Sequence, residues 1–223
     1  MEKMMKMTDQ GKAIRQENGG RRPEGKGAGY DKAAQGVNRP IYDYYAGKIK
    51  EKSAITQGFC LDVGANGGYL GLALARITNL DFTFLDISAE ALEKAKQNIV
   101  HGGLGQRAKT LHADVHDIPL PDGSIQMVIS RGSIPFWDDP VKALKEIYRV
   151  LAPGGEAWVI CGRGTPEIQA AIEASGGEKS GDRGRWGPGN RPKRDYEAML
   201  KQSGVSRSSF NRGDDGMWIR LWK

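Results

Sequence analysis

The chain has 223 residues, enough for one domain with a substantial hydrophobic core. Two cysteines are too few for a disulfide scaffold, no apolar run reaches membrane-spanning length, and the first residues lack the hydrophobic centre of a secretory signal, so we expect a cytoplasmic protein. The net charge is +6, but residues 53–175 carry −4, whereas residues 1–52 carry +5 and residues 176–194 carry +4. This distribution argues against a basic nucleic-acid-binding face on the folded body.

The first 40 residues are expected to form a flexible basic arm or lid. Residues 19–29 are rich in glycine and charge, a composition typical of segments that bury too little apolar surface to fold alone. After a break at Arg39-Pro40, apolar side chains recur at helical spacing over residues 41–52. The folded domain is therefore expected to span residues 41–223.

The segment Phe59–Ala75, with the sequence FCLDVGANGGYLGLALA, combines three local patterns. Its apolar run up to Val63 predicts a buried strand, Gly64–Gly68 predicts a tight turn, and the apolar residues that follow predict a helix to about Asn79. A strand, a glycine turn and a helix in this order begin an open parallel α/β sheet. Glycine suits the turn because it adopts backbone conformations that other residues avoid and lets a ligand approach the main chain.

The rest of the chain alternates between strand and helix patterns. Further strands are expected over residues 81–86, 108–113, 125–130, 157–161, 205–211 and 217–222. Further helices are expected from the cap Ser88 to His101 and over residues 141–151, 166–175 and 195–203. This order indicates a mostly parallel sheet with an antiparallel C-terminal hairpin. Residues 176–194 interrupt the pattern with a Gly/Arg-rich stretch, which we expect to be a mobile loop.

The spacing within the glycine turn separates several nucleotide-binding templates. A dinucleotide fingerprint needs glycine where Asn66 and Tyr69 stand, and a phosphate-binding loop needs a lysine that the turn lacks. The pattern Asp62-x-Gly64-x-x-x-Gly68 instead resembles the acid-plus-glycines motif of class I S-adenosylmethionine (SAM)-dependent methyltransferases. That family usually has a third glycine at the place of Asn66, and asparagine tolerates left-handed backbone geometry better than most residues.

Three further segments resemble the same family, in the expected order. Asp86 ends the second strand, where a carboxylate either accepts bonds from ribose hydroxyls or caps the next helix. Asp114-Val115 follows the third strand; in the family, the acid at this place binds the adenine amino group and the next amide meets the ring. The segment 146–155, EIYRVLAPGG, is similar to the helix and turn before the family's fifth strand. Within that family, the sequence resembles the small-molecule branch that includes the quinone-biosynthesis C-methyltransferases.

The resemblance implies a Rossmann-like, seven-stranded sheet and in-line transfer of the sulfonium methyl group of SAM to a small-molecule acceptor. Two alternatives stay open: an RNA or protein methyltransferase that uses the basic flanks, and a SAM-binding protein without catalysis. The expected cofactor-binding residues are Asp62, Gly64, Asn66, Gly68, Asp86, Ile87, Asp114, Val115, Ser130 and Arg131. No catalytic residue is assigned, no metal is expected, and neither a nucleic acid nor a membrane is the favoured partner.

Two groups of side chains near the expected site have more than one interpretation. Arg131 either binds an acidic group of the acceptor or cofactor, or forms an ion pair with the Asp138–Asp139 region. The tyrosines of the first helix either pack in the core or lie over the cofactor or acceptor; they are Tyr42, Tyr44 and Tyr45.

The triplet His112-x-Asp114-x-His116 also has two interpretations: it either binds a metal ion or its members have separate roles. Alternate residues of a strand share one face, as metal ligands do, but the sequence shows no fourth ligand and Asp114 already has a role. Phe136 and Trp137, after the fourth strand, either line an apolar acceptor pocket or pack in the core.

Overall fold

A computed structural model describes residues 33–176 and 194–223. Most of the arm expected over residues 1–40 and nearly all of the loop expected over 176–194 therefore lie outside the described residues. The strands are β1 (Gln57–Val63), β2 (Asn79–Asp86), β3 (Ala108–His112), β4 (Ile125–Arg131), β5 (Leu151–Cys161), β6 (Ser208–Gly213) and β7 (Gly216–Trp222). The helices are α3 (Arg39–Lys52), α4 (Tyr69–Ala75), α5 (Ala89–His101), α6 (Pro140–Val150), α7 (Pro166–Ala174), α8 (Tyr196–Gln202) and the short 3-10 helix η1 (Ile134–Phe136).

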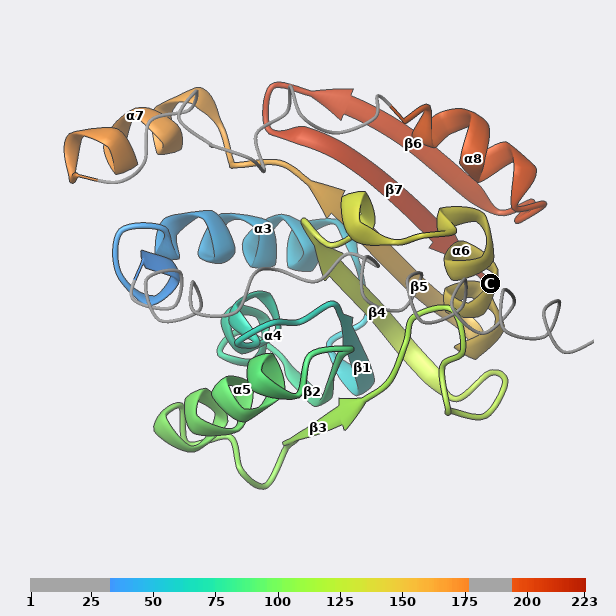
Figure 1. The fold of residues 1–223 in the computed structure, drawn as a ribbon, viewed down its shortest axis with the longest axis horizontal. Coiled ribbons are helices and arrows are strands. Elements are labelled where there is room, and N and C mark those ends of the chain that lie inside the picture. Colours follow the sequence, from blue (N-terminus) through green and yellow to red (C-terminus); the bar gives the residue numbers. More distant parts are fainter. Residues whose placement is uncertain (1–32, 177–193) are drawn as a thin grey trace, which may run out of the picture.

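The strands form one seven-stranded sheet in the order β3-β2-β1-β4-β5-β7-β6. Strands β1 to β5 pair in parallel, while β7 runs antiparallel to both β5 and β6 (Figure 1). In the closing hairpin Gly213 pairs with Gly216, so Asp214 and Asp215 form the turn. The predicted α/β fold, mostly parallel with an antiparallel C-terminal hairpin, is confirmed.

Helices cover both faces of the sheet, with α3, α4 and α5 on one side and α6 and α8 on the other (Figure 1). Successive side chains of a strand point to opposite faces. Cys60 of β1 therefore packs in the core under α3–α5, whereas its neighbour Leu61 packs in the core under α6 and α8. A strand buried on both faces reads as a continuous apolar run, which explains the composition of β1.

Most helices begin at a residue whose side chain caps the first turn, and α3 has a proline in its first turn. Four caps accept a hydrogen bond from a backbone N–H three residues later, and these caps are Ser88, Asp139, Thr165 and Asp195. Helix α3 begins at Arg39 and not after the expected break, because proline is favourable in a first turn, where its missing N–H costs nothing. Pro40 therefore lies within the first turn of α3 and does not mark a break before it.

Two further differences from the predicted boundaries are explained by long-range pairing. Helix α4 ends at Ala75 and not near Asn79, because Asn79 already belongs to β2 and donates its N–H to the Thr56 carbonyl. Strand β5 begins at Leu151, which pairs with Ile125 of β4, and the Pro-Gly-Gly turn lies within β5 as a register shift.

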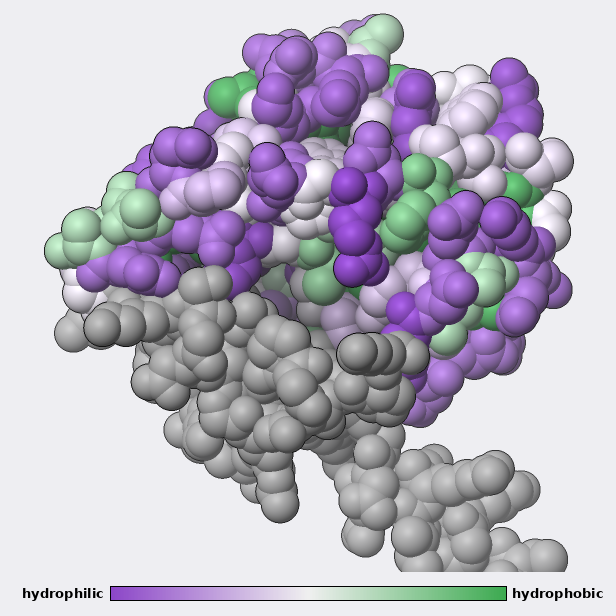
Figure 2. Space-filling view, turned by 90° about the horizontal axis from the view of Figure 1, so that it is seen from above, coloured by the Kyte–Doolittle hydropathy of each residue, from purple (hydrophilic) through white to green (hydrophobic). Residues whose placement is uncertain are grey.

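The described surface is mainly polar in the view from above, where hydrophobic residues occur only in small groups (Figure 2). Within residues 33–176 and 194–223, no helix combines the length and apolarity that crossing a bilayer requires. The apolar side chains are instead concentrated in the two cores on either side of the sheet.

Candidate cofactor site

Three aspartates lie at one edge of the sheet, at or just after the carboxyl ends of adjacent strands. Asp62 is the penultimate residue of β1, Asp86 is the last residue of β2, and Asp114 follows β3 by two residues. Parallel pairing aligns these ends, because Asp62 lies opposite Phe84 and Asp86 lies opposite His112. In open α/β sheets ligands bind outside this edge.

The turn after β1 has the left-handed backbone that the sequence predicts. Gly64, Asn66 and Gly68 have φ angles of 65°, 52° and 79°. The inference that asparagine keeps this geometry is therefore confirmed. A Cβ atom at Gly64 would lie 2.4 Å from the Ser133 Cβ, so the backbone passes close to the loop after β4. Ser130 is fully buried there, and its hydroxyl lies 2.5 Å from the Ser133 hydroxyl.

Asp86 connects the glycine turn to the segment before α5. Its Oδ2 accepts the Asn66 N–H at 2.8 Å and its Oδ1 accepts the Ser88 N–H at 2.9 Å. Each carboxylate oxygen has a second lone pair, so these bonds leave acceptor capacity for a ligand. The next residue, Ile87, is 61% exposed, and its carbonyl lies 2.9 Å from the His112 Nε2. The residue directly after Asp86 thus has a solvent-exposed apolar side chain.

Asp62 is the buried member of the three aspartates. It is 2% exposed, and its Oδ2 accepts the Gly71 N–H at 3.0 Å. Burial raises the pKa of its carboxyl from 3.8 to about 8; the Asp86 charge adds to this shift and the Gly71 bond opposes it. A cation beside Asp62 would lower this pKa and favour the ionised form.

Asp114 and His116 form a pair in the loop after β3. The Asp114 Oδ1 accepts the His116 backbone N–H at 2.8 Å and lies 2.5 Å from its ring Nδ1. The ring Nε2 accepts the N–H of Asp139, the capping residue of α6, at 3.1 Å. His112 contacts the Ile87 carbonyl instead, so the triplet does not converge. Across the described residues, no three His, Cys, Asp or Glu side chains are grouped to hold a metal ion.

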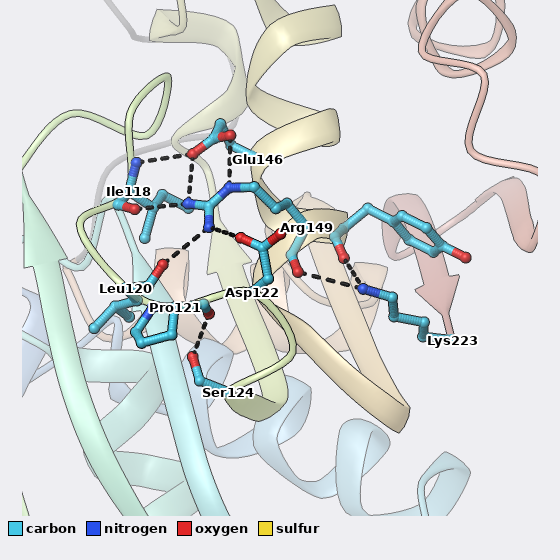
Figure 3. A network of polar contacts seen from close by, with 9 residues as sticks. Ile118, Leu120, Pro121, Asp122, Ser124, Glu146, Arg149 and Lys223 are labelled. Carbon is cyan, nitrogen blue, oxygen red and sulfur yellow. Dashed lines mark hydrogen bonds and ion pairs between the residues drawn. The ribbon is translucent and has the colours of Figure 1, made fainter.

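Arg149 of α6 binds the loop after β3 and so connects this loop to α6 (Figure 3). Its guanidinium donates to the Ile118 and Leu120 carbonyls at 2.7 and 2.9 Å, and it pairs with Asp122 and Glu146. Glu146 also accepts the Ile118 N–H at 3.1 Å. The EIYRVLAPGG segment therefore contributes the two charged side chains that hold the loop carrying the third aspartate.

Arg131, the last residue of β4, links that strand to β5 and α3. Its Nη2 donates to the Gly162 carbonyl at 2.8 Å, and its guanidinium carbon lies 4.8 and 5.5 Å from the ring centroids of Tyr42 and Tyr45. Both tyrosines are buried and pack in the core under α3–α5. Trp137 is also buried and packs in the core under α6.

A cavity of about 260 Å³ lies among α3, α4 and α5. Its apolar lining includes Tyr42, Tyr69 and Leu72, and its polar lining includes Arg39 and Arg76. None of the residues expected to bind a cofactor lines it. The chemistry that the three aspartates offer is therefore at the strand ends and not in this cavity.

Comparison with known proteins places this geometry in a family. A methyltransferase-domain family model matches residues 61–159, which include all three aspartates. A solved structure from Methanococcus maripaludis, assigned as a SAM-dependent methyltransferase, has a TM-score of 0.79 and 31% sequence identity, and the match covers 88% of this chain and 91% of that one. This chain belongs to the SAM-dependent methyltransferase family. The resemblance seen in the sequence is thus confirmed, and the cofactor of this methyltransferase family is SAM.

Curated relatives of this methyltransferase family match over about 100 residues. A rice 2-methyl-6-phytyl-1,4-hydroquinone methyltransferase is 36% identical over 101 residues, which are 45% of this chain and 29% of that protein. The ubiquinone/menaquinone biosynthesis C-methyltransferase UbiE of Rickettsia bellii is 37% identical over 101 residues, which are 43% of this chain and 41% of that protein. The chain therefore spans less than half the length of these relatives.

Two residues that shape this candidate site have roles that the sequence did not predict. Gly71 donates to Asp62, and a Cβ at its position would lie 2.3 Å from the Phe84 ring. A glycine inside a predicted helix was the available signal, because such a glycine often marks close packing. His116 orients Asp114, but only the fold brings it to its second partner, Asp139.

Proposed function

We propose that this protein transfers the methyl group of SAM to a small-molecule acceptor at the carboxyl edge of β1–β4. The observation that carries the proposal is the row of three aspartates beside a left-handed glycine turn, in a chain of this family. This set of acceptors matches a ligand that presents an ammonium group, ribose hydroxyls and an exocyclic amine. When bound, the cofactor supplies an activated methyl group on a sulfonium.

The roles of the side chains follow from their positions. Asp62 provides the carboxylate for the ammonium end, and Asp86 accepts bonds from the ribose hydroxyls. Asp114 accepts the adenine amino group through Oδ2, because the bonds from His116 occupy its Oδ1. The exposed Ile87 and the loop at Val115 enclose the ring. The remaining expected residues shape the backbone around this site, and they are Gly64, Asn66, Gly68, Ser130 and Arg131.

Positioning supplies most of the acceleration in this proposal, because a sulfonium methyl needs only an aligned acceptor atom. The relatives named for hydroquinone and quinone substrates favour a ring carbon of an aromatic acceptor. The net charge of −4 over residues 53–175 disfavours RNA, whose phosphates bind basic surfaces. A cytoplasmic location belongs to the same proposal and is tested by cell fractionation.

The proposal is tested by following conversion of SAM to S-adenosylhomocysteine near physiological salt. We expect turnover with a small-molecule extract that contains hydroquinones and none with total RNA or with protein. Transfer to RNA alone, lost on deletion of residues 1–20 while SAM binding persists, would replace the small-molecule acceptor by RNA. Binding of SAM without turnover on any of these acceptors would favour the non-catalytic alternative.

Replacing Asp86 by alanine should weaken S-adenosylhomocysteine binding by about 1–3 kcal/mol, roughly 5- to 150-fold, because ribose hydroxyls lose their acceptor. The change also removes the acceptor of the Asn66 N–H and loosens the turn. Calorimetric titration measures the effect. The matched control is Asp81→Ala, at an exposed position of the same strand. Equal affinities of the two variants would show that Asp86 does not bind the ligand.

A further inference from the structure

We propose that His116 is a positioning residue that holds the Asp114 carboxylate so that it discriminates adenine from other bases. The inference rests on the proposed function, since it assumes that Asp114 meets the nucleobase. It adds a role for a side chain that the family motifs do not include. The inference concerns orientation only, and His116 itself need not touch the ligand.

The two oxygens of the Asp114 carboxylate have different surroundings. Both bonds from His116, one from the backbone N–H and one from the ring, end on Oδ1. Within the described residues, no group donates to Oδ2. The Asp114 side chain is 45% exposed, whereas the His116 side chain is 16% exposed. The histidine therefore supports the carboxylate from the protein side, and Oδ2 remains available at the surface.

The hydrogen-bond partners of the His116 ring indicate which of its two nitrogens carries the hydrogen. Nε2 accepts the Asp139 N–H, so it carries a lone pair, and Nδ1 carries the hydrogen that Asp114 accepts. Because both ring nitrogens are engaged by the protein, neither is free to take a proton from an acceptor molecule. This arrangement fits a fixed support between the loop and helix α6 and does not fit a general base.

The residue that anchors His116 is itself held by hydrogen bonds. Asp139 caps α6 by accepting the Lys142 N–H at 2.9 Å, and Arg149 of the same helix holds the loop beyond His116. The backbone N–H that binds Nε2 is thus part of a defined helix start. Removing the imidazole should leave the backbone N–H of residue 116 as the remaining support of Oδ1, so the Asp114 carboxylate is less firmly oriented while the loop stays attached through Arg149.

The test compares two ligands that differ only at the adenine amino group: S-adenosylhomocysteine and its purine analogue, in which a hydrogen atom replaces the amine and N1 stays an acceptor. A hydrogen bond to a charged group is worth enough for wild-type protein to prefer the adenosyl ligand by roughly 10- to 100-fold. We expect His116→Ala to reduce this preference to about threefold or less. His116→Asn should restore most of it, because its amide can donate at the place of Nδ1.

The ratio of two affinities is insensitive to the folded fraction, so partial unfolding of a variant does not imitate the effect. The matched control is His101→Ala, which removes a histidine whose Nδ1 faces the Gln97 carbonyl on α5. This variant should keep the wild-type preference.

Two outcomes separate the inference from the proposed function. If Asp114→Ala loses the preference and His116→Ala keeps it, the positioning role is wrong and the cofactor site stands. If wild-type protein binds neither ligand, the proposed function itself is wrong.

Discussion

Asp62→Asn should become more stable relative to the wild type by about 3 kcal/mol between pH 5 and pH 7. Burial raises the folded-state pKa of Asp62 from 3.8 to about 8, so the folded protein holds a proton that the unfolded chain releases. Stability from this group is present below pH 3.8 and is lost as the pH rises through about 8. Asparagine cannot ionise, yet its amide oxygen still accepts the Gly71 N–H.

Urea unfolding at pH 5, 6 and 7 measures the difference, which should grow by about 1.4 kcal/mol per pH unit. The control is Asp81→Asn, whose exposed position should keep the change within about 0.5 kcal/mol at every pH. Parallel stability curves for Asp62→Asn and the wild type would show that the buried carboxyl does not retain its proton.

The same carboxyl should link ligand binding to proton release. If the ammonium end of SAM lies beside Asp62, binding favours the ionised form, and the protein releases up to one proton per ligand at pH 7. Titration calorimetry in two buffers of different ionisation enthalpy reports this release. In Asp62→Asn the release should vanish.

Gly162→Ala should cost about 2–4 kcal/mol of folding free energy, because the added methyl group has no space. A Cβ at Gly162 would lie 2.0 Å from the Asp215 carbonyl oxygen and 2.3 Å from the Tyr45 hydroxyl oxygen. Tyr45 donates its hydroxyl to that carbonyl and accepts the Gly164 N–H at 2.9 Å. The methyl group would therefore push apart α3, the end of β5 and the turn of the C-terminal hairpin.

Chemical denaturation measures this cost, and Gly47→Ala provides the opposite control. Gly47 lies on the exposed face of α3, and a Cβ atom added there would meet nothing within 4 Å, so alanine should stabilise by about 0.5–1 kcal/mol. A loss below about 0.5 kcal/mol for Gly162→Ala would mean that the hairpin turn moves away at little cost.

Local patterns were sufficient to predict the sheet and where the three aspartates lie in it. The apolar run of β1 and the left-handed turn at Asn66 depend on residues close in sequence, as does the cap Ser88. The three aspartates were predicted because each lies at or just after the end of a predicted strand, and parallel strands bring their carboxyl ends to one edge.

Features that depend on distant partners could not be predicted. The Gly162 carbonyl that binds Arg131 lies 31 residues away, and the Asp139 N–H that binds His116 lies 23 residues away. Strand β6 begins at Ser208 and not at Val205, because Val205 packs in the core beside α8 instead of pairing. Periodicity reports which face of an element is apolar, and it carries no information on such contacts.

The loop after β3 is held at its start by His116. Further along, Arg149 holds it through the Ile118 and Leu120 carbonyls (Figure 3). A loop that is already ordered has little conformational entropy left to lose when a ligand packs against it. Association at this end of the site should therefore follow rigid-body kinetics, without the large heat-capacity decrease that accompanies folding on binding. Affinity for the nucleobase would then depend mainly on the fit of the contacts themselves.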